Sequence, residues 1–266
     1  MVVLMPEAGE SELKSLAAKA GLSKQFTFKE FKIFEALSAL FRANSEHRLD
    51  FVFKGGTALN KAYFAGSQRF SEDIDFDFFS KEARAKKISR LTSLARSITG
   101  FTVQGPWIRR DTVRFNLGYS FIGRPDHVRL EFSIGKLSIT LHPIALADLS
   151  FDITGNTLGR IPCYSLDDMV ARKFNALRTR TEGKDVWDCF HGIPKTKELK
   201  KAIRLAMESE GISLSVDEAV SGAIKRLEKA DPKKMMNATN PYVPLRLRPK
   251  DWEEAIMGVI RELELL

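Results

Sequence analysis

The sequence predicts an α/β protein of the α+β kind, with helices first, a sheet-containing core next and a helical part last. Two observations carry this prediction. Residues 73–78 alternate between aspartate and apolar side chains, as a strand with two unlike faces does. From Ser165 onward, apolar residues recur at helical spacing almost to the end. We therefore expect an N-terminal helical arm at 1–50, a core at 51–164 and a helical C-terminal domain at 165–266.

The first expected elements are helices at 11–20 and 27–43. The second helix has an apolar face at mostly helical spacing, formed by Phe28, Phe31, Ile33, Phe34, Leu37 and Leu40. A short strand follows at 51–53. We then expect a tight turn, Lys54-Gly55-Gly56-Thr57, and a helix over 57–65.

The core continues after the strand at 73–78. Ser80 is suited to cap a long basic helix that runs to about residue 98, with Glu82 near the positive end of its dipole. Segments with β-type composition follow at 101–104, 112–121, 127–134, 151–153 and 158–163.

The last third is predicted to be helical with one interruption. Ser165 and Asp168 have the spacing of a capping box at the start of a helix. The stretch 231–250 contains several prolines and predicts a loop, and a last helix is expected from about residue 251.

Composition narrows the class of protein. The chain has 266 residues, 44% hydrophobic and 29% charged, which is ordinary for a globular protein with a substantial core. No apolar run reaches the roughly 18 residues of a membrane span, and the N-terminus lacks a basic leader, so we expect neither membrane insertion nor export. Cys163 and Cys189 have no metal-ligand spacing and suit a reducing, cytoplasmic setting. The formal net charge of +8 is compatible with a polyanionic partner and equally with unspecific solubilising charge.

The aspartates of 73–78 are the first candidate site. Strand alternation places Asp73, Asp75 and Asp77 on one face. Such a face is often merely solvated, but two carboxylates at i and i+2 can also converge on Mg²⁺, which prefers oxygen ligands. Two such ions about 4 Å apart can stabilise the entering and leaving oxygens of a phosphoryl displacement.

The glycine turn upstream favours the metal hypothesis. Gly55 and Gly56 lie between a strand and a helix, where paired glycines let the backbone approach a phosphate and the helix N-terminus offers free N–H groups. Lys61, Arg69 and Ser71 lie between this turn and the aspartates. The combination predicts a site for a nucleoside triphosphate and its metal ions.

These residues also resemble a known family. The stretch from Lys54 to Lys61, followed by that from Arg69 to Phe76, resembles the K-G-G-T-x-L-x-K … R-x-S-x-D-I-D signature of the AbiEii/MenT group of nucleotidyltransferase toxins. The resemblance implies the minimal nucleotidyltransferase fold, a small mixed sheet with helices plus a C-terminal helical region. It also implies that Asp73 and Asp75 bind the metal, and it places Thr57 and the glycines at the triphosphate.

A second segment continues the resemblance. Lys173 falls within the apolar stripe of the helix after Ser165, where a cation needs a partner, a ligand or an extended path to solvent. The stretch from Lys173 to Arg180 resembles the family motif K-L-x-A-x-x-x-R, and that from Lys184 to Asp188 resembles R-D-L-Y-D with lysine in place of arginine. The resemblance implies that Lys173 binds nucleotide and that Asp185 supports the catalytic centre, although Asp185 also suits a helix N-terminus.

A third carboxylate is common in this superfamily, and two residues compete for its role. Glu131 shares a strand face with Arg129 and Ser133, so it is a candidate metal ligand or general base. A surface pair of Glu131 with Arg129 or Arg114 is an equal alternative, and Asp185 is the rival carboxylate.

The sequence therefore predicts an enzyme that uses Mg²⁺ or Mn²⁺ to transfer a nucleoside monophosphate from an NTP to an acceptor. The resemblance implies RNA as acceptor, such as the 3′ end of tRNA, and a toxin that has a cognate antitoxin protein. The alternatives are a nucleotide- or RNA-binding regulator without catalysis and an enzyme that modifies a protein or a small molecule. Basic residues outside the predicted NTP site form three groups that are suited to RNA: Arg84, Lys86, Lys87 and Arg90; Arg109, Arg110 and Arg114; Arg246, Arg248 and Lys250.

Overall fold

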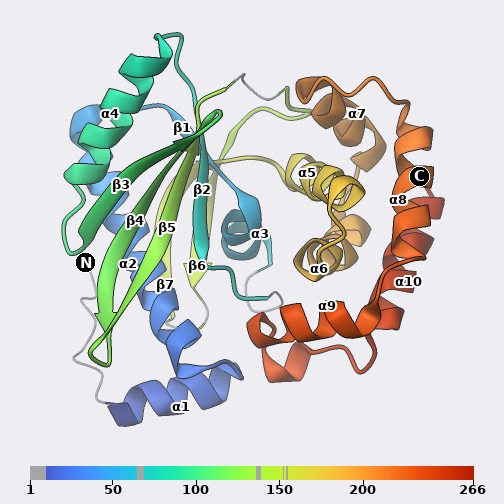
Figure 1. Cartoon of the computed structure of the whole chain (residues 1–266), viewed down its shortest axis with the longest axis horizontal. Coiled ribbons are helices and arrows are strands. Elements are labelled where there is room, and N and C mark those ends of the chain that lie inside the picture. The colour runs from blue at the N-terminus through green and yellow to red at the C-terminus, as the bar shows by residue number, and fades with distance from the viewer. Residues whose placement is uncertain (1–9, 65–68, 136–138, 152, 154) are drawn as a thin grey trace. The chain divides into compact units, whose positions relative to one another are not determined.

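The computed structural model of the chain describes residues 10–64, 69–135, 139–151, 153 and 155–266 (Figure 1). It divides into two compact units. The first comprises Met1–Gly66, Phe70–Gly135 and Leu146–Cys163, and the second comprises Ser67–Arg69, Lys136–Ala145 and Tyr164–Leu266. The helices that we expected as a separate arm therefore belong to the first unit. None of the helices among the described residues has the length and apolar character that a membrane span requires.

The first unit is built on a seven-stranded mixed sheet, which confirms the predicted fold class. Its strand order is β3-β4-β5-β2-β1-β7-β6. Strand β2 is central, parallel to β5 on one side and antiparallel to β1 on the other. The strands are β1 (Phe51–Lys54), β2 (Asp73–Phe78), β3 (Thr102–Arg109), β4 (Thr112–Phe121), β5 (Arg124–Ser133), β6 (Ala145–Phe151) and β7 (Asn156–Cys163).

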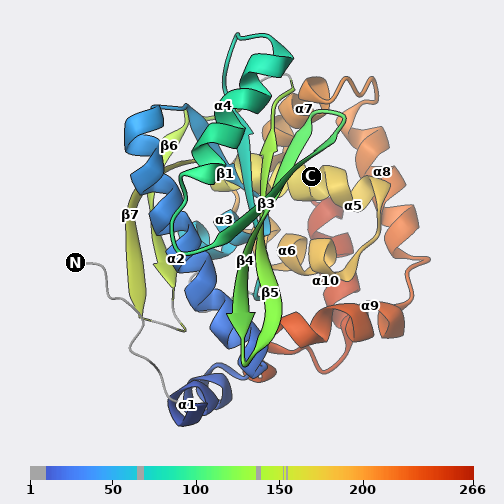
Figure 2. The same cartoon turned by 60° about the vertical axis from the view of Figure 1, so that its left-hand side comes forward.

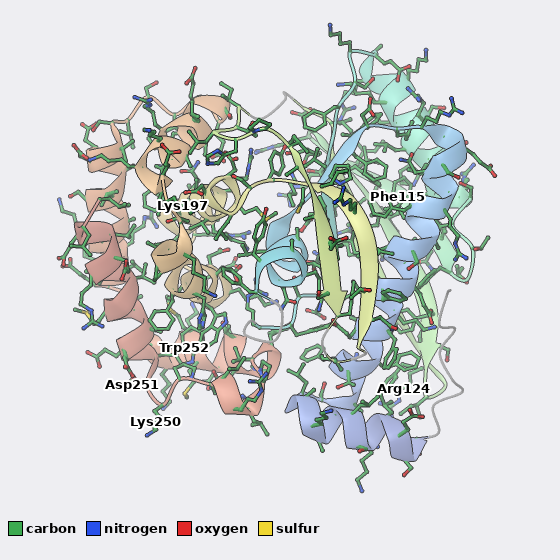
Figure 3. All side chains as sticks on the ribbon, turned by 180° about the vertical axis from the view of Figure 1, so that it is seen from behind. Phe115, Arg124, Lys197, Lys250, Asp251 and Trp252 are labelled. Atoms are coloured by element: carbon green, nitrogen blue, oxygen red, sulfur yellow. The ribbon has the colours of Figure 1, made fainter. Side chains whose placement is uncertain are left out.

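Four helices complete the first unit: α1 (Glu10–Ala20), α2 (Lys24–His47), α3 (Gly55–Tyr63) and α4 (Arg84–Arg96). Helices α2 and α4 contact each other and pack on the sheet (Figure 2). The apolar face of the sheet is rich in phenylalanine: the rings of Phe51, Phe76 and Phe132 contact one another, and Phe41 of α2 packs on the first two. Phe115 is fully buried nearby on β4 (Figure 3). Aromatic burial of this extent fixes which face of the sheet is covered.

The second unit is helical, as predicted. Its elements are α5 (Leu166–Thr179), α6 (Gly183–Gly192), α7 (Leu199–Ser209), α8 (Val216–Leu227), α9 (Pro232–Thr239) and α10 (Trp252–Glu264), with short 3-10 turns η1 (Ile193–Lys195), η2 (Asn240–Tyr242) and η3 (Leu245–Leu247). Trp187 and Trp252 are buried at its centre with ring centroids 5.8 Å apart. Lys250, just before α10, extends outward (Figure 3).

Four local predictions were wrong. The glycines after β1 form the first turn of α3 instead of a separate turn, and the expected end of that helix at residue 65 lies outside the described residues. Helix α4 begins at Arg84, because the Ser80 hydroxyl accepts the Glu82 N–H in a preceding turn. Strand β6 ends at Phe151, where we expected a strand over 151–153, of which residue 152 is not described.

The fourth difference is α9, which lies within the predicted loop 231–250. The Asp231 carboxylate accepts the N–H groups of Lys233 and Lys234 and so caps this helix. Pro232 occupies the first helical position, where a missing N–H costs nothing. The proline that suggested a loop therefore marks a helix start.

Candidate active site

The candidate metal ligands lie on the polar face of the central strand. Ile74 and Phe76 of β2 are fully buried, whereas Asp73 and Asp75 are half-buried and point to the other face. Asp75 pairs in register with Glu131 of the parallel strand β5, and Asp73 pairs with Arg129. Paired residues of neighbouring strands project to the same side. The structure therefore brings Asp73, Asp75 and Glu131 together on one face, as the sequence predicted.

Arg129 partly neutralises this face. Its guanidinium lies 3.4 Å from an Asp73 carboxylate oxygen and 3.9 Å from Glu131. Of the two surface pairs considered for Glu131, the pair with Arg129 is present in this weak form. Arg114 is the register neighbour of Glu131 on β4, but among the described residues it forms no ion pair with it. The side chains of Asp73 and Arg129 are about two-fifths exposed, at 38% and 42%, so their attraction is screened by water.

Gly55 makes room for the second aspartate. Its φ is +78°, a conformation that L side chains rarely adopt, and a Cβ atom there would collide with the Asp75 carboxylate. The carboxylate thus lies against the N-terminus of α3, where the positive end of the helix dipole favours a negative charge. We had interpreted the glycines as room for a phosphate. The structure shows that the first of them accommodates Asp75.

The other residues of the first motif hold the site together. The Thr57 hydroxyl is fully buried and donates to the backbone carbonyl of Asp73, which ties the start of α3 to the start of β2. Lys54 donates to Asp77 at 2.5 Å and to Ser133 at 2.7 Å. Lys61 is buried, pairs with Glu30 of α2 and lies over the Phe151 ring. Gly56 and Ser71 are half-buried.

The second motif forms a buried charge network in the second unit. Asp188 accepts two hydrogen bonds from the Arg69 guanidinium, at 2.8 and 3.0 Å, and lies 2.7 Å from the Lys173 ammonium. Lys173 also lies 3.2 Å from Asp185, which accepts a hydrogen bond from Arg180 at 2.9 Å. The side chains of both aspartates are 1% exposed. Lys173 is therefore balanced by two carboxylates and does not extend past the apolar stripe into solvent.

The network shifts the pKa values of its members. Burial alone would raise the pKa of Asp188, but the charges of Arg69 and Lys173 outweigh burial and hold it below its ordinary value. Burial likewise opposes the charge of Lys173, yet the two aspartates raise its pKa. Asp188 and Lys173 therefore stay ionised at neutral pH, because each buried charge meets its opposite.

Asp188 is the functional residue that the sequence analysis named only as part of a motif. It follows Asp185 by three residues, and residues at i and i+3 share one face of a helix. That spacing is the signal that would have placed both carboxylates beside Lys173. The capping box predicted at Ser165 is half formed: Ser165 accepts the Asp168 N–H, whereas the Asp168 carboxylate accepts the Leu141 N–H.

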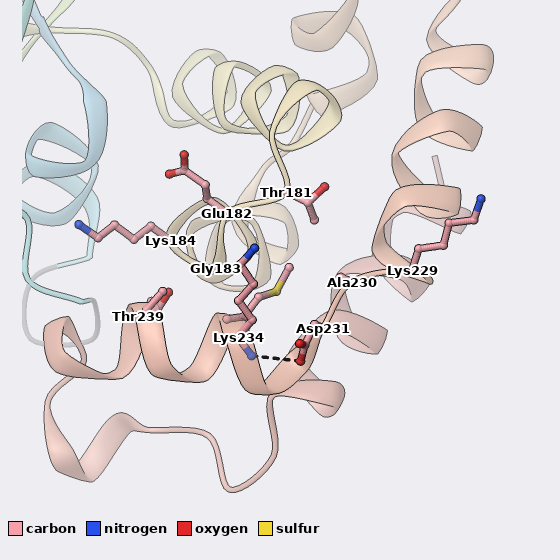
Figure 4. A pocket seen from close by; sticks show the side chains of 11 residues that line it. Thr181, Glu182, Gly183, Lys184, Lys229, Ala230, Asp231, Lys234 and Thr239 are labelled. Carbon is pink, nitrogen blue, oxygen red and sulfur yellow. Dashed lines mark hydrogen bonds between the residues drawn. The ribbon is translucent and has the colours of Figure 1, made fainter.

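A cavity of about 490 Å³ lies elsewhere in the second unit, where α6 begins and α9 passes (Figure 4). Gly183 allows this close packing, because a Cβ there would collide with the Thr239 hydroxyl. Lys234 points into the cavity in Figure 4, and Lys184 lies 3.5 Å from the Tyr242 ring centroid. The carboxylates of the two motifs are not among its lining residues.

The carboxylates on β2 and β5 are suited to supply part of the ligands of Mg²⁺. Across the part of the chain that the structure describes, no three His, Cys, Asp or Glu side chains are grouped closely enough to hold a metal ion. Mg²⁺, however, is usually bound through only one or two carboxylates, with water and substrate phosphates as its other ligands. Two half-exposed aspartates on one strand face fit that pattern.

The fold matches that of known proteins. MenT4, a nucleotidyltransferase toxin from Mycobacterium tuberculosis H37Rv, is similar in fold with a TM-score of 0.63 and 19% sequence identity, covering 96% of this chain and 90% of that one. JHP933 from Helicobacter pylori has a TM-score of 0.53 and 18% identity, and 92% of each chain is covered. No curated protein sequence matches the chain.

The family match shows that the chain is a nucleotidyltransferase. Residues 38–258 match the family described as "Nucleotidyl transferase AbiEii toxin, Type IV TA system". The chain therefore belongs to the AbiEii family of toxins, as its motifs indicated. Membership implies an NTP substrate and an antitoxin counterpart.

Proposed function

We propose that this nucleotidyltransferase uses Mg²⁺ or Mn²⁺ to transfer a nucleoside monophosphate from an NTP to a hydroxyl of RNA. The acceptor oxygen forms a bond to the α-phosphorus while the bond from that phosphorus to the β-phosphate oxygen breaks. The hydroxyl proton passes to a base, and pyrophosphate leaves. The observation that carries this proposal is the register of β2 with β5, which gathers Asp73, Asp75 and Glu131 on one half-exposed face.

Asp73 and Asp75 are proposed as the metal-binding residues. When bound, the metal ions would neutralise the triphosphate and stabilise the entering and leaving oxygens. The Thr57 hydrogen bond holds the backbone of Asp73, and the absence of a Cβ atom at Gly55 leaves room for the Asp75 carboxylate.

Glu131 is our candidate for the third carboxylate. It is the register neighbour of Asp75 and half-buried, so it can act as a ligand or accept the hydroxyl proton. Asp185 is already balanced by Lys173 and Arg180 within the second unit. We therefore propose that Asp185 positions those two cations and that Glu131 completes the metal site.

We further propose nucleotide-binding residues within each of the two motifs. The N-terminus of α3 offers the N–H groups of the first turn, a common arrangement for phosphates. Lys54 and Arg180 are the more accessible cations, whereas Lys61, Arg69 and Lys173 are buried in ion pairs and would act mainly by positioning. Gly56, Thr57 and Ser71 complete the proposed set.

RNA, in particular the 3′ end of tRNA, is the acceptor that the net charge of +8 supports, because a basic protein gains affinity by neutralising phosphates. Adding a nucleotide to a mature RNA end would block its use, which is a plausible chemistry for a toxin of the cytoplasm. The antitoxin would then be the partner that prevents or reverses this block.

The test is transfer of label from each NTP to total cellular RNA in the presence of Mg²⁺. Wild-type protein should label RNA, and Asp73→Asn or Asp75→Asn should lower the rate by more than about a hundredfold, since loss of even an outer-shell partner costs about 10–100-fold. Asp77→Asn is the matched control, because Asp77 shares the face but pairs with Lys54.

Each outcome of this assay is informative. Near-wild-type transfer by Asp73→Asn or Asp75→Asn refutes the metal assignment. Label that appears only on a protein or on a small-molecule hydroxyl keeps the chemistry and replaces the acceptor. Circular dichroism of the two variants should match the wild type, because each substitution relieves repulsion between neighbouring carboxylates.

A further inference from the structure

An exposed tryptophan lies on the edge strand of the sheet. Trp107 of β3 is 41% exposed, whereas Trp187 and Trp252 are each 1% exposed. The proposed active site does not use it. Tryptophan is enriched at interfaces, because its ring offers a large apolar surface together with one N–H donor.

A β-bulge directs this tryptophan to the polar face. The register between β3 and β4 shifts between Gln104 and Trp107, so one extra residue is accommodated there. Gly105 allows the bulge: its φ is +110°, and a Cβ would lie 2.8 Å from the Arg114 carbonyl oxygen. Simple alternation from Gln104 would place Pro106 on the polar face and Trp107 on the apolar one.

The bulge aligns Trp107 with the carboxylates. Trp107 pairs with Arg114, Arg114 pairs with Glu131, and Glu131 pairs with Asp75, so one row of side chains crosses four strands on the same face. Neighbouring strands are about 4.8 Å apart, which puts Trp107 about 14 Å from Asp75. All four residues belong to the first unit.

The side chain between them has hydrogen-bonding capacity to spare. The Arg114 guanidinium lies 5.3 Å from the Trp107 ring centroid, a cation–π arrangement that orients both groups. Its buried Nε has no hydrogen-bond partner, and neither has the Asn116 Oδ1 on the same face, among the residues that the structure describes. Buried polar atoms without partners are costly, so stability alone does not explain this row of polar side chains.

One further arginine of β3 lies on the same face as the tryptophan. Arg109 follows on the same polar face, in the row of Thr112 and Ser133. The Arg84 guanidinium of α4 donates to the Arg110 carbonyl at the β3–β4 turn. Helix α4 packs with α2 on the other side of the sheet, so Arg109 and Arg114, and not the basic residues of α4, share the face of Trp107.

We propose that Trp107 and Arg114 form a stacking platform for a base of the single-stranded acceptor RNA, upstream of the hydroxyl that is modified. Aromatic rings interleaved with cations are how proteins hold single strands without reading their sequence. The spacing of about 14 Å corresponds to about four stacked nucleotides. This inference rests on the proposed RNA acceptor and adds the residues that would hold it.

Intrinsic fluorescence tests the platform directly, because the other two tryptophans are buried. A single-stranded RNA of about twelve nucleotides, within the usual site size, should quench the Trp107 emission. Inorganic polyphosphate of equal charge has no bases and should bind without comparable quenching. Equal quenching by both polyanions would overturn the proposal.

Three variants separate stacking from charge and from folding. Trp107→Ala should weaken RNA binding by between about fivefold and a hundredfold, the range for loss of one base–aromatic stack. Trp107→Phe should retain most of the affinity. Ile108→Ala is the matched control, since Ile108 is the next residue of β3, is 45% exposed and points to the other face. NTP affinity should be unchanged in all three.

The outcomes distinguish the stacking platform from the proposed RNA acceptor on which it rests. If RNA binds and is labelled but Trp107→Ala behaves like the wild type, the platform is wrong and the RNA acceptor stands. If the wild type neither binds nor labels RNA, both fail. If the antitoxin protects Trp107 from acrylamide quenching and RNA does not, the surface is a protein interface.

Discussion

The carboxylates of the two units have the same chemistry and opposite surroundings. In the first unit, Asp73 lies on an open strand face, is 38% exposed and has an arginine no closer than 3.4 Å. In the second unit, the Asp188 side chain is 1% exposed and is bound by Arg69 and Lys173 at 2.7–3.0 Å. A carboxylate that water still reaches can exchange its counter-charge for a metal ion. One that is enclosed by internal cations instead fixes the helices that carry it.

The family motifs do not distinguish these two roles. Both aspartate pairs belong to the matched signatures, and both span only a few residues of sequence. The difference lies in the partners: Arg69 is 119 positions from Asp188, and Lys173 is on another helix. What separates a reactive carboxylate from a structural one is therefore its distance to cations and its access to water.

The largest expected effect is on the free energy of unfolding when a carboxylate of the second unit is neutralised. Asp188→Asn should lower the free energy of unfolding by about 3–5 kcal/mol, because it removes the counter-charge that the buried Arg69 and Lys173 share. Urea denaturation followed by circular dichroism measures the change. Asp168→Asn is the control: that carboxylate is also buried, but its partners are the uncharged Leu141 N–H and Ser165 hydroxyl, so its loss leaves no buried cation without a counter-charge.

A stable Asp188→Asn protein without transfer activity would contradict the structural role that we assign to Asp188. In that case the second cluster would be reactive and not structural. Asp75→Asn provides the opposite reference, since we expect it to lose transfer and to retain its stability.

A smaller effect is expected from Gly55→Ala. The methyl group would displace the Asp75 carboxylate and would also strain a backbone with φ of +78°. We expect transfer to fall by about a hundredfold, which corresponds to about 2.7 kcal/mol in the activation free energy. The initial rate at saturating NTP and Mg²⁺ is the appropriate measurement.

Gly123→Ala is the matched control for backbone strain. Its φ is +72°, and no atom lies within 4 Å of the position that a Cβ would take. This variant should lose some stability and keep its transfer activity. Equal activity losses in both glycine variants would mean that strain, and not the displacement of Asp75, explains the effect.

The smallest effect concerns pH. The pKa of Asp188 is lowered on folding, so its contribution to stability is present above its ordinary pKa of 3.8 and is lost as the pH falls through the folded value. The pKa of Lys173 is raised, so its contribution is present below 10.5 and is lost as the pH rises through its folded value. The contribution of these two residues to stability should be constant between these limits.

Urea midpoints measured across the pH range test this. Asp188→Asn should remove most of the acid-side decline, whereas Asp73→Asn should leave it in place. If the two variants give parallel pH profiles, the buried network does not control acid stability.

Sequence periodicity predicted the elements whose faces differ most. Strand β2 was predicted to the residue, since aspartate and apolar side chains alternate along it, and α10 was located within one residue of its start. Proline misled us at α9, because the same residue that breaks a helix interior is favourable in its first turn.

Only part of the candidate site could be predicted from the sequence. The common face of Asp73, Asp75 and Glu131 followed from alternation and was found in the register. The roles of Gly55 and Lys61 did not follow, because a collision with Asp75 and an ion pair with Glu30 depend on contacts between distant segments. Trp107 was also missed, since a bulge reverses the alternation on which such predictions rest.

The register of β2 also limits how the gene can vary. A substitution in this strand alters one side chain, but the insertion or deletion of a single codon shifts every following residue to the opposite side. Aspartates would then enter the phenylalanine core, and phenyl rings would replace the carboxylates. Because β2 has neighbours on both sides, the sheet cannot absorb the change at an edge. Among surviving descendants of this sequence, we expect length variation in the hairpin turns and none between residues 73 and 78.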